Sequence, residues 1–291
     1  MAIGTVVFYP NYIHNSGYDA AAEPSIVTQN YASSGGETTG AAYDLVDNRR
    51  DARITIDTSG ETDNFNVDFD LTANITAANF VIVDNHNFQT ASAEITVGYG
   101  GSAQTIASGY AGTLNNALAL LTLSTNVLRK PITDGILLIN FSGTRTAQNF
   151  EVYSTYESDV GIEYTADVLM GEIGIGASFT PSVAPDINLI ETQHFDGVEV
   201  RRSAGGQNTS FKRYGERKAW ALTWSYVSNT DKEGFQKVFQ ITEGGRYPFW
   251  IDLGESATPH LYYVRFLQNA LSVRKLTANA YEVTILIESE V

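Results

Sequence analysis

The sequence contains no cysteine, which excludes disulfide bonds, thiolate metal ligands and cysteine nucleophiles together. Its four histidines are scattered along the chain, and neither HExxH nor any other paired histidine spacing is present. The GxSxG and Walker A motifs of serine hydrolases and P-loop nucleotide-binding proteins are also missing. We therefore predict no cofactor and no metal, and we predict that the chain is not an enzyme.

Long apolar runs are missing as well. No stretch approaches the roughly 18 apolar residues of a membrane-spanning helix, so no membrane span is predicted. The first ten residues, MAIGTVVFYP, lack a basic segment, and Pro10 with Asn11 ends their apolar run. A secretory signal peptide is therefore not expected, and synthesis in a cytoplasm is predicted.

Basic residues are scarce, with 18 Lys and Arg against 33 Asp and Glu, a net charge of −15 that disfavours nucleic acid as a partner. The charge is uneven: residues 1–165 hold 6 basic and 18 acidic residues, and the remainder holds 12 and 15. This asymmetry predicts two domains, at 1–165 and 190–291. The Gly-, Ser- and Pro-rich stretch MGEIGIGASFTPSVAPD predicts a linker between them, at 166–189.

The first domain is predicted to be all β. Apolar and polar residues alternate in several short segments, other segments are continuous apolar runs, and Gly, Asn, Ser and Asp separate them, which favours a β-sandwich. The predicted strands lie near 67–71, 80–83, 95–99, 136–141 and 150–153. The segment LNNALALLTL at 114–123 fits either a helical turn or a strand.

The second domain contains the most informative segment, Trp220 to Asp252. Bulky residues alternate in WALTWSY, which predicts a half-buried strand. Thr230 and Glu233 match a capping box at the start of a helix over 230–242, and Gly244 with Gly245 predicts its end. An aromatic strand follows in YPFWI. The aromatic residues are expected to form a core, and the segment contains no cluster of catalytic residues.

Polar residues mark two candidate ligand sites in the first domain. Asp44, Asp47 and Asp51 lie close together and could bind a cation or a sugar through oxygen atoms, or could form a solvated acidic loop paired with neighbouring arginines. Asn85 and His86 directly follow a predicted buried strand, where they could contact a glycan or bond to the loop backbone. No carboxylate pair is singled out for glycosidase chemistry.

A basic, glycine-containing segment in the second domain, RRSAGGQNTSFKR at 201–213, is predicted to be a mobile contact loop. Its basic residues are Arg201, Arg202, Lys212 and Arg213. Complementary potentials fix the register of protein contacts, so this loop could meet the acidic first domain of a neighbouring subunit.

Two resemblances to known families follow from these segments. AYDLVDNRR at 42–50, FNVDFDL at 65–71 and FVIVDNHNF at 80–88 resemble galactose-binding-like, discoidin-type jelly-roll modules over about 150 residues. RKAWALTW at 217–224, GGRYPFWID at 244–252 and YYVRF at 262–266 are similar to phage minor tail and distal tail proteins. The second resemblance covers residues 190–291 and includes Phe235 and Phe239 of the predicted helix.

Together the resemblances imply a mainly β protein, with a jelly-roll sandwich followed by a tail-tube-like sandwich that has one flanking helix. They imply a structural protein of a bacteriophage tail, either a distal tail protein or part of a baseplate ring. Its partners would be further copies in a hexameric or trimeric ring, other tail proteins and possible host glycans, and its location would be the virion. The alternative is a carbohydrate-binding module of an adhesion protein, and a glycan-cleaving enzyme is a third class.

Overall fold

The computed structural model describes much of the chain and confirms its mainly β character, with one α-helix among the described residues. Within the part of the chain that the structure describes, no helix is long and apolar enough to cross a membrane. The described residues are 4–13, 25–29, 38–39, 42–48, 52–58, 64–91, 93, 95–100, 119–120, 135–154, 164–186, 190–195, 198–202, 208–212, 216–255 and 260–290.

The chain forms two compact units, and the first of them is discontinuous in sequence. The sheet–helix unit contains residues 1–10 and 179–291, and the sandwich unit contains residues 11–178. These bounds differ from the predicted domains in two places. The first ten residues belong with the C-terminal part of the chain, and the beginning of the predicted linker belongs to the sandwich unit.

The sheet–helix unit is built on a seven-stranded antiparallel sheet in the order β1-β15-β16-β18-β14-β11, with β17 also paired to β18. The pairing of β1 with β15 brings the N-terminal strand into this sheet. A separate hairpin, β12–β13, follows β11. The elements are β1 (Val7–Pro10), β11 (Ile190–Phe195), β12 (Val198–Arg202), β13 (Asn208–Lys212), β14 (Glu216–Val227), α1 (Asn229–Ile241), β15 (Phe249–Asp252), β16 (Leu261–Phe266), β17 (Ser272–Lys275) and β18 (Tyr281–Ser289).

Aromatic side chains form the centre of this unit. Phe8 of β1 lies 5.7 Å from Phe235 of α1 and 6.0 Å from Trp224 of β14 between ring centroids, and Phe249 lies 6.2 Å away. All four are buried. Edge-to-face and tilted ring pairs at these distances add to the free energy of burial. The predicted aromatic core of the Trp220–Asp252 segment is therefore confirmed, except that Tyr226 is 71% exposed.

The N-cap of helix α1 lies two residues earlier than predicted. Ser228 is the N-cap, and its hydroxyl accepts a hydrogen bond from the Asp231 N–H while the Asp231 carboxylate accepts one from the Ser228 N–H. The capping box thus uses Ser228 and Asp231, not Thr230 and Glu233. The pattern S-x-x-D occurs two positions before T-x-x-E, and the buried position of Asp231 decides between them.

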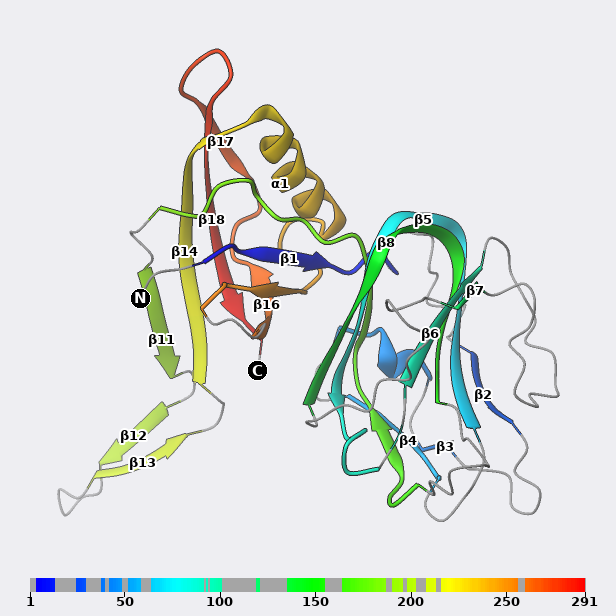
Figure 1. Cartoon of the computed structure of the whole chain (residues 1–291). Helices are drawn as coiled ribbons and strands as arrows, with labels where there is room; N and C mark the ends of the chain where they lie inside the picture. The colour runs from blue at the N-terminus through cyan, green and yellow to red at the C-terminus, as the bar shows by residue number, and fades with distance from the viewer. Residues whose placement is uncertain are drawn as a thin grey trace. The chain divides into compact units, whose positions relative to one another are not determined.

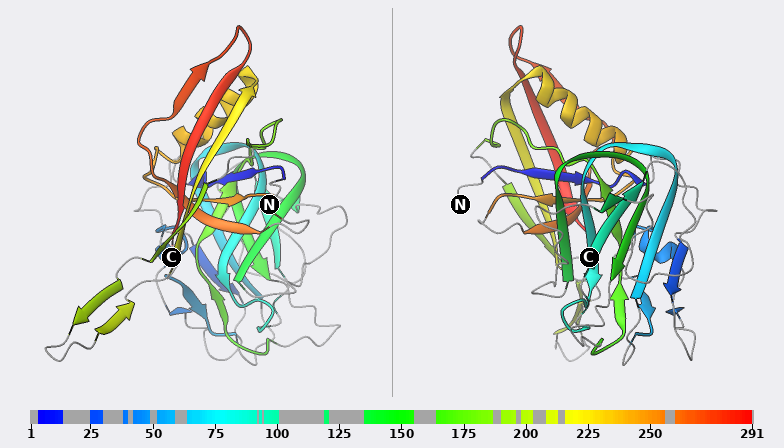
Figure 2. Two further views of the ribbon diagram at one scale, coloured as in Figure 1. Left: turned by 90° about the vertical axis from the view of Figure 1, so that its left-hand side faces the viewer. Right: turned by 45° about the vertical axis from the view of Figure 1, so that its right-hand side comes forward.

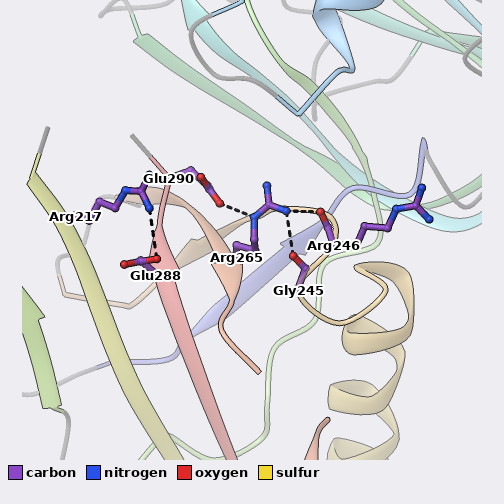
Figure 3. A network of polar contacts seen from close by, with 6 residues as sticks. All are labelled: Arg217, Gly245, Arg246, Arg265, Glu288 and Glu290. Carbon is purple, nitrogen blue, oxygen red and sulfur yellow. Dashed lines mark hydrogen bonds and ion pairs between the residues drawn. The ribbon is translucent and has the colours of Figure 1, made fainter. Parts of the chain in front are cut away.

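Arg265 of β16 links the turn after α1 to the residue that follows β18. Its guanidinium donates to the backbone carbonyls of Gly245, at 3.0 Å, and Arg246, and it forms an ion pair with Glu290 (Figure 3). Gly244 adopts a left-handed φ of 68°, as the predicted glycine termination requires. A Cβ on Gly245 would lie 2.4 Å from the Phe266 carbonyl oxygen, so this close approach also needs glycine.

The sandwich unit is organised by two long strands that bend together (Figure 1). The six-stranded sheet has the order β10-β5-β8-β6-β7, with β2 also paired to β5, and β3-β4-β9 form a second sheet. Successive register shifts between Asp70 and Phe80 mark the bend in β5. The elements are β2 (Ser25–Gln29), β3 (Thr38–Thr39), the 3-10 helix η2 (Ala42–Leu45), β4 (Ile54–Ile56), β5 (Asn64–His86), β6 (Ile95–Gly100), β7 (Ala119–Leu120), β8 (Gly135–Ser154), β9 (Val168–Met170) and β10 (Ile173–Gly176).

The alternating segments predicted as strands lie in this bent sheet. Val67, Phe69 and Leu71 are buried at every second position, whereas Phe80 to Val83 are all buried. The two segments, predicted as separate strands, are the two halves of β5. Within the ambiguous segment 114–123, Ala119–Leu120 is strand β7, and the other positions lie outside the described residues.

Residues 166–178, the first part of the predicted linker, are an integral strand-forming segment of the sandwich unit. Strand β10 pairs with β5 and all four of its residues are buried. The Asn11 side-chain amide donates to the Ile173 carbonyl at 3.0 Å, and Asn87 donates to the Asp167 carbonyl at 2.8 Å. The hydroxyl of Thr58 accepts from the Val168 N–H at 3.1 Å. Side chains that are distant in sequence thus form hydrogen bonds with the backbone of this segment. The local composition of the segment does not reveal these partners.

Candidate functional site

Two polar segments that stood out in the sequence meet at Glu172: the residues after η2 and the C-terminal end of β5. From one side, the Asn48 N–H donates to the Glu172 carboxylate at 3.1 Å. From the other side, the Asp84 N–H donates to the Glu172 carbonyl at 2.8 Å, and the Gly171 N–H donates to the Asp84 carbonyl at 3.0 Å. A Cβ on Gly171 would lie 2.9 Å from the Cβ of Asn85. The residues after η2 and the end of β5 are therefore joined through Gly171 and Glu172.

Asp47, Asp84 and Glu172 form what we call the carboxyl cluster. Glu172 and Asp84 are fully buried, and Asp47 is half-buried. Burial raises the pKa of Glu172 well above its ordinary value, and the charges of Asp47 and Asp84 raise it further, while the hydrogen bond from Asn48 lowers it. Among the described residues, neither its Oε1 nor the Oδ1 of neighbouring Asn48 has a hydrogen-bond partner, and both atoms are buried. Acceptor oxygens in and beside the cluster therefore exceed the donors that the described residues supply.

The three predicted aspartates have different places in the structure. Asp44 lies in η2 and Asp47 follows it; both are half-buried, and Asp47 is close enough to Glu172 to affect its pKa. Asp51 lies outside the described residues. Of the three predicted aspartates, Asp47 is therefore the one that belongs to the carboxyl cluster.

Asn85 and His86 have mainly structural contacts. Asn85 adopts a left-handed φ of 53°, and its N–H donates to the Asp84 carboxylate at 2.7 Å. His86 is 4% exposed, its ring stacks on Phe88 at 4.3 Å, and its Nδ1 accepts from the Phe88 N–H. Of the two interpretations of His86, the hydrogen bond to the loop backbone is present, and glycan contact stays a prediction. Asn85 remains half-buried beside the carboxyl cluster.

Sequence reasoning missed Glu172, a buried member of the carboxyl cluster. Asp84 stands directly before Asn85 and His86 in the polar segment after the predicted buried strand. Glu172 was a lone acidic residue in the Gly- and Ile-rich stretch MGEIGIG, and this was the available signal. Oxygen groups of this kind accept hydrogen bonds from hydroxyl donors and also suit hard cations. Within the described residues, however, no group of three His, Asp or Glu side chains is arranged to hold a metal ion.

The predicted basic contact loop is largely a β-hairpin. Arg201 and Arg202 lie in β12 and Lys212 ends β13, and the residues between these strands lie outside the described residues. The register pairs Arg202 with Asn208 and Lys212 with Val198, so these basic positions lie at opposite ends of the hairpin. Arg213 lies outside the described residues. The segment predicted to be a mobile loop therefore contains two strands, because VEVRR pairs antiparallel with NTSFK.

No protein-family model matches the chain, and no curated protein matches it. Among solved structures, matches include chitosan-binding module 1 of a chitosanase/glucanase from Paenibacillus sp. IK-5, at 19% identity, with 57% of this chain and 97% of that module covered and a TM-score of 0.35. The family 32 carbohydrate-binding module of Clostridium perfringens NanJ, in complex with galactose, is 10% identical, with 58% and 98% covered and a TM-score of 0.33.

A fucolectin from the serum of striped bass, Morone saxatilis, is 11% identical, with 97% of this chain and 99% of the lectin covered and a TM-score of 0.36. The predicted mainly β class is confirmed by the strands and sheets of the described residues. A jelly-roll of the discoidin type stays a prediction.

Proposed function

We propose that this protein binds carbohydrate through its sandwich unit and does not catalyse a reaction. The observation that carries the proposal is the meeting of the residues after η2 and the end of β5 at Glu172. Half-buried Asp44, Asp47 and Asn85 then offer carboxylate and amide groups near one end of the unit. Such groups recognise the hydroxyls of a sugar by hydrogen bonds, and a few well-placed polar groups suffice to orient a ligand.

The buried members of the carboxyl cluster support binding over catalysis. A glycosidase needs two carboxyl groups that both reach the scissile bond. Glu172 and Asp84 are fully buried, and Glu172 has a raised pKa, so neither offers an accessible carboxylate. Incubating the purified chain with polysaccharides and measuring released reducing ends tests this proposal, and turnover abolished by Asp47→Asn would overturn it.

The binding proposal is tested with the full chain on a glycan array that includes galactose- and chitosan-based ligands, the sugars named for two of the similar structures. For a ligand found there, the double variant Asp44→Asn and Asp47→Asn should weaken affinity at least about tenfold, about 1.4 kcal/mol, because two acceptors become amides. Asp57→Asn, an exposed acid of the same unit, is the matched control. Equal affinity of both variants would reject this site.

A second candidate function is that of a structural protein of a bacteriophage tail, located in the virion after synthesis in the host cytoplasm. The hairpin β12–β13 favours it, because this hairpin pairs with no other described strand and carries basic residues on an acidic chain. Negative-stain electron microscopy of the purified chain tests this function. Rings at high protein concentration would support it, whereas isolated particles together with glycan binding would favour an adhesion protein.

A further inference from the structure

We propose that the hairpin β12–β13 docks on the acidic sandwich unit of a second copy of this chain. The inference rests on the assembly function proposed above and names its contact surfaces. Among the described strands, β12 and β13 pair only with each other, and Figure 2 shows them as a separate two-stranded ribbon. An isolated two-stranded hairpin is at best marginally stable in water, and its open edges can accept further partners. Docking would supply the missing contacts.

The charges of the chain identify the partner surface. The described hairpin strands contain Arg201, Arg202 and Lys212 against one acid, Glu199, a net charge of +2. The sandwich unit has 6 basic and 20 acidic residues, a net charge of −14, whereas the sheet–helix unit has 12 basic and 13 acidic residues, a net charge of −1. Nearly the whole negative charge of the molecule is therefore in the sandwich unit, which is the surface that attracts a basic hairpin most strongly.

The spacing of the basic positions favours an extended acidic surface over a single small anion. Arg202 pairs with Asn208 at one end of the hairpin, and Lys212 pairs with Val198 at the other. Four residues of strand separate these pairs, roughly 13 Å at the usual rise of a β-strand. A single phosphate or carboxylate could not reach both ends, whereas a protein surface with distributed carboxylates could.

Docking of this kind is heterologous, because the hairpin and the sandwich unit are different surfaces of the same chain. Each copy gives one hairpin and receives one, so the contact can repeat from copy to copy and closes into a ring when the rotation allows. A copy with a defective hairpin can still receive a neighbour, but it cannot extend the assembly further. This asymmetry gives a specific experimental signature.

The test compares two matched charge reversals in the full-length protein. Arg201→Glu with Arg202→Glu alters an adjacent pair in β12, and Arg274→Glu with Lys275→Glu alters an exposed adjacent pair in β17 of the same unit by the same charge. Sedimentation over a range of concentrations should show self-association of the wild type, a dissociation constant at least about tenfold higher for the β12 variant, and a nearly unchanged one for the β17 variant. Equal effects of both reversals would overturn the inference.

Two further measurements decide whether the contact is between copies. The amides of β12 and β13 should become protected from hydrogen exchange as the protein concentration rises, and about 0.5 M salt should reverse this protection. Adding the β12 variant to wild type should shorten assemblies, because it ends them. Wild-type protein that stays monomeric, or protection that is independent of concentration, contradicts the inference. Wild-type protein that associates with a dissociation constant unaffected by the β12 reversal rejects the docking inference alone, whereas wild-type protein that stays monomeric rejects the assembly function as well.

Discussion

In the sheet–helix unit, aromatic side chains from segments far apart in the sequence meet in one apolar core, whereas in the sandwich unit many long-range connections are hydrogen bonds from side-chain amides and hydroxyls. Phe8 and Trp224 represent the first arrangement, and Asn11 and Asn87 represent the second. The charge follows the same division, because the sandwich unit has nearly all of the net negative charge. The sandwich unit therefore combines acidity with buried polar connections, while the sheet–helix unit is built around aromatic packing.

The two units can be followed separately in solution. All three tryptophans, Trp220, Trp224 and Trp250, belong to the sheet–helix unit and are buried there. Tryptophan fluorescence therefore reports unfolding of this unit alone, and far-ultraviolet circular dichroism reports both. The predictions below use this difference and run from the largest expected effect to the smallest.

Phe8→Ala should have the largest effect. Removing this ring leaves a cavity among Phe179, Trp224, Phe235 and Phe249, which typically costs about 3–5 kcal/mol of the free energy of unfolding. The loss should appear in the tryptophan-fluorescence transition during urea unfolding. Tyr226→Ala removes an aromatic ring that is 71% exposed and is the control, with an expected change within about 0.5 kcal/mol. A Phe8→Ala effect confined to the other transition would contradict the assignment of β1 to the sheet–helix unit.

Asn11→Ala should destabilise the sandwich unit through lost hydrogen bonds. The Asn11 side chain donates to the Ile173 carbonyl and accepts from the Ile13 N–H, and all these groups are buried. Leaving buried partners unsatisfied costs about 1–3 kcal/mol each, so we expect a loss of about 2–3 kcal/mol. Urea unfolding followed by circular dichroism should show it, with the tryptophan transition unchanged. A shift of both transitions by the same amount would show that the units do not unfold separately.

Glu172→Gln should change how the stability of the sandwich unit depends on pH. Because the pKa of Glu172 is raised in the folded state, the protonated carboxyl favours folding, and its contribution is lost as pH rises from the unfolded pKa through the folded one. In that window the wild type loses about 1.4 kcal/mol per pH unit relative to the variant. Urea unfolding from pH 4 upward measures the difference, with Asp57→Asn as control. Parallel profiles of wild type and Glu172→Gln would refute the raised pKa.

Asp231→Asn should have the smallest effect and the opposite pH dependence. Burial alone would raise the pKa of Asp231, but hydrogen bonds from Ser182 and Ser228 outweigh burial and lower it. The carboxylate therefore stabilises the sheet–helix unit above its unfolded pKa, and this stability is lost as pH falls through the folded pKa. At neutral pH we expect a loss of about 1–2 kcal/mol in the tryptophan transition. The difference should disappear in strong acid, and a constant difference would argue against the lowered pKa.

Local patterns predicted the elements whose structure depends on neighbours in sequence. Alternation around Phe69 and Trp224 predicted strands, and helical spacing of Phe235 and Val238 predicted α1 within one residue at each end. These predictions succeed because the periods of a strand and a helix are visible in a few consecutive residues. The predicted N-cap of α1 was wrong. Two overlapping capping patterns are present in the sequence, and the one that forms is decided by which acidic residue is buried.

The candidate site was predictable only in part. Asp47 and Asn85 were named because acidic and amide residues stood out in their loops, but their connection through Glu172 joins positions more than 80 residues apart. Glu172 lay in a stretch whose glycines and prolines suggested a linker. His86 was named as a polar loop residue, yet its ring stacks on the ring of Phe88. Composition indicates which groups are present, while burial and partners depend on the whole sheet.

The sequence by itself determined the mainly β class, the aromatic content of one region, the acidity of the other and the lack of recognised catalytic motifs, because these follow from composition and short-range periodicity. Only the tertiary structure decided that strand β1 completes the C-terminal sheet, that residues 166–178 are part of the sandwich unit, and that Glu172 lies near both Asp47 and Asp84. The physical reason is that backbone pairing and desolvation act between segments far apart in the chain, whose approach no local pattern encodes.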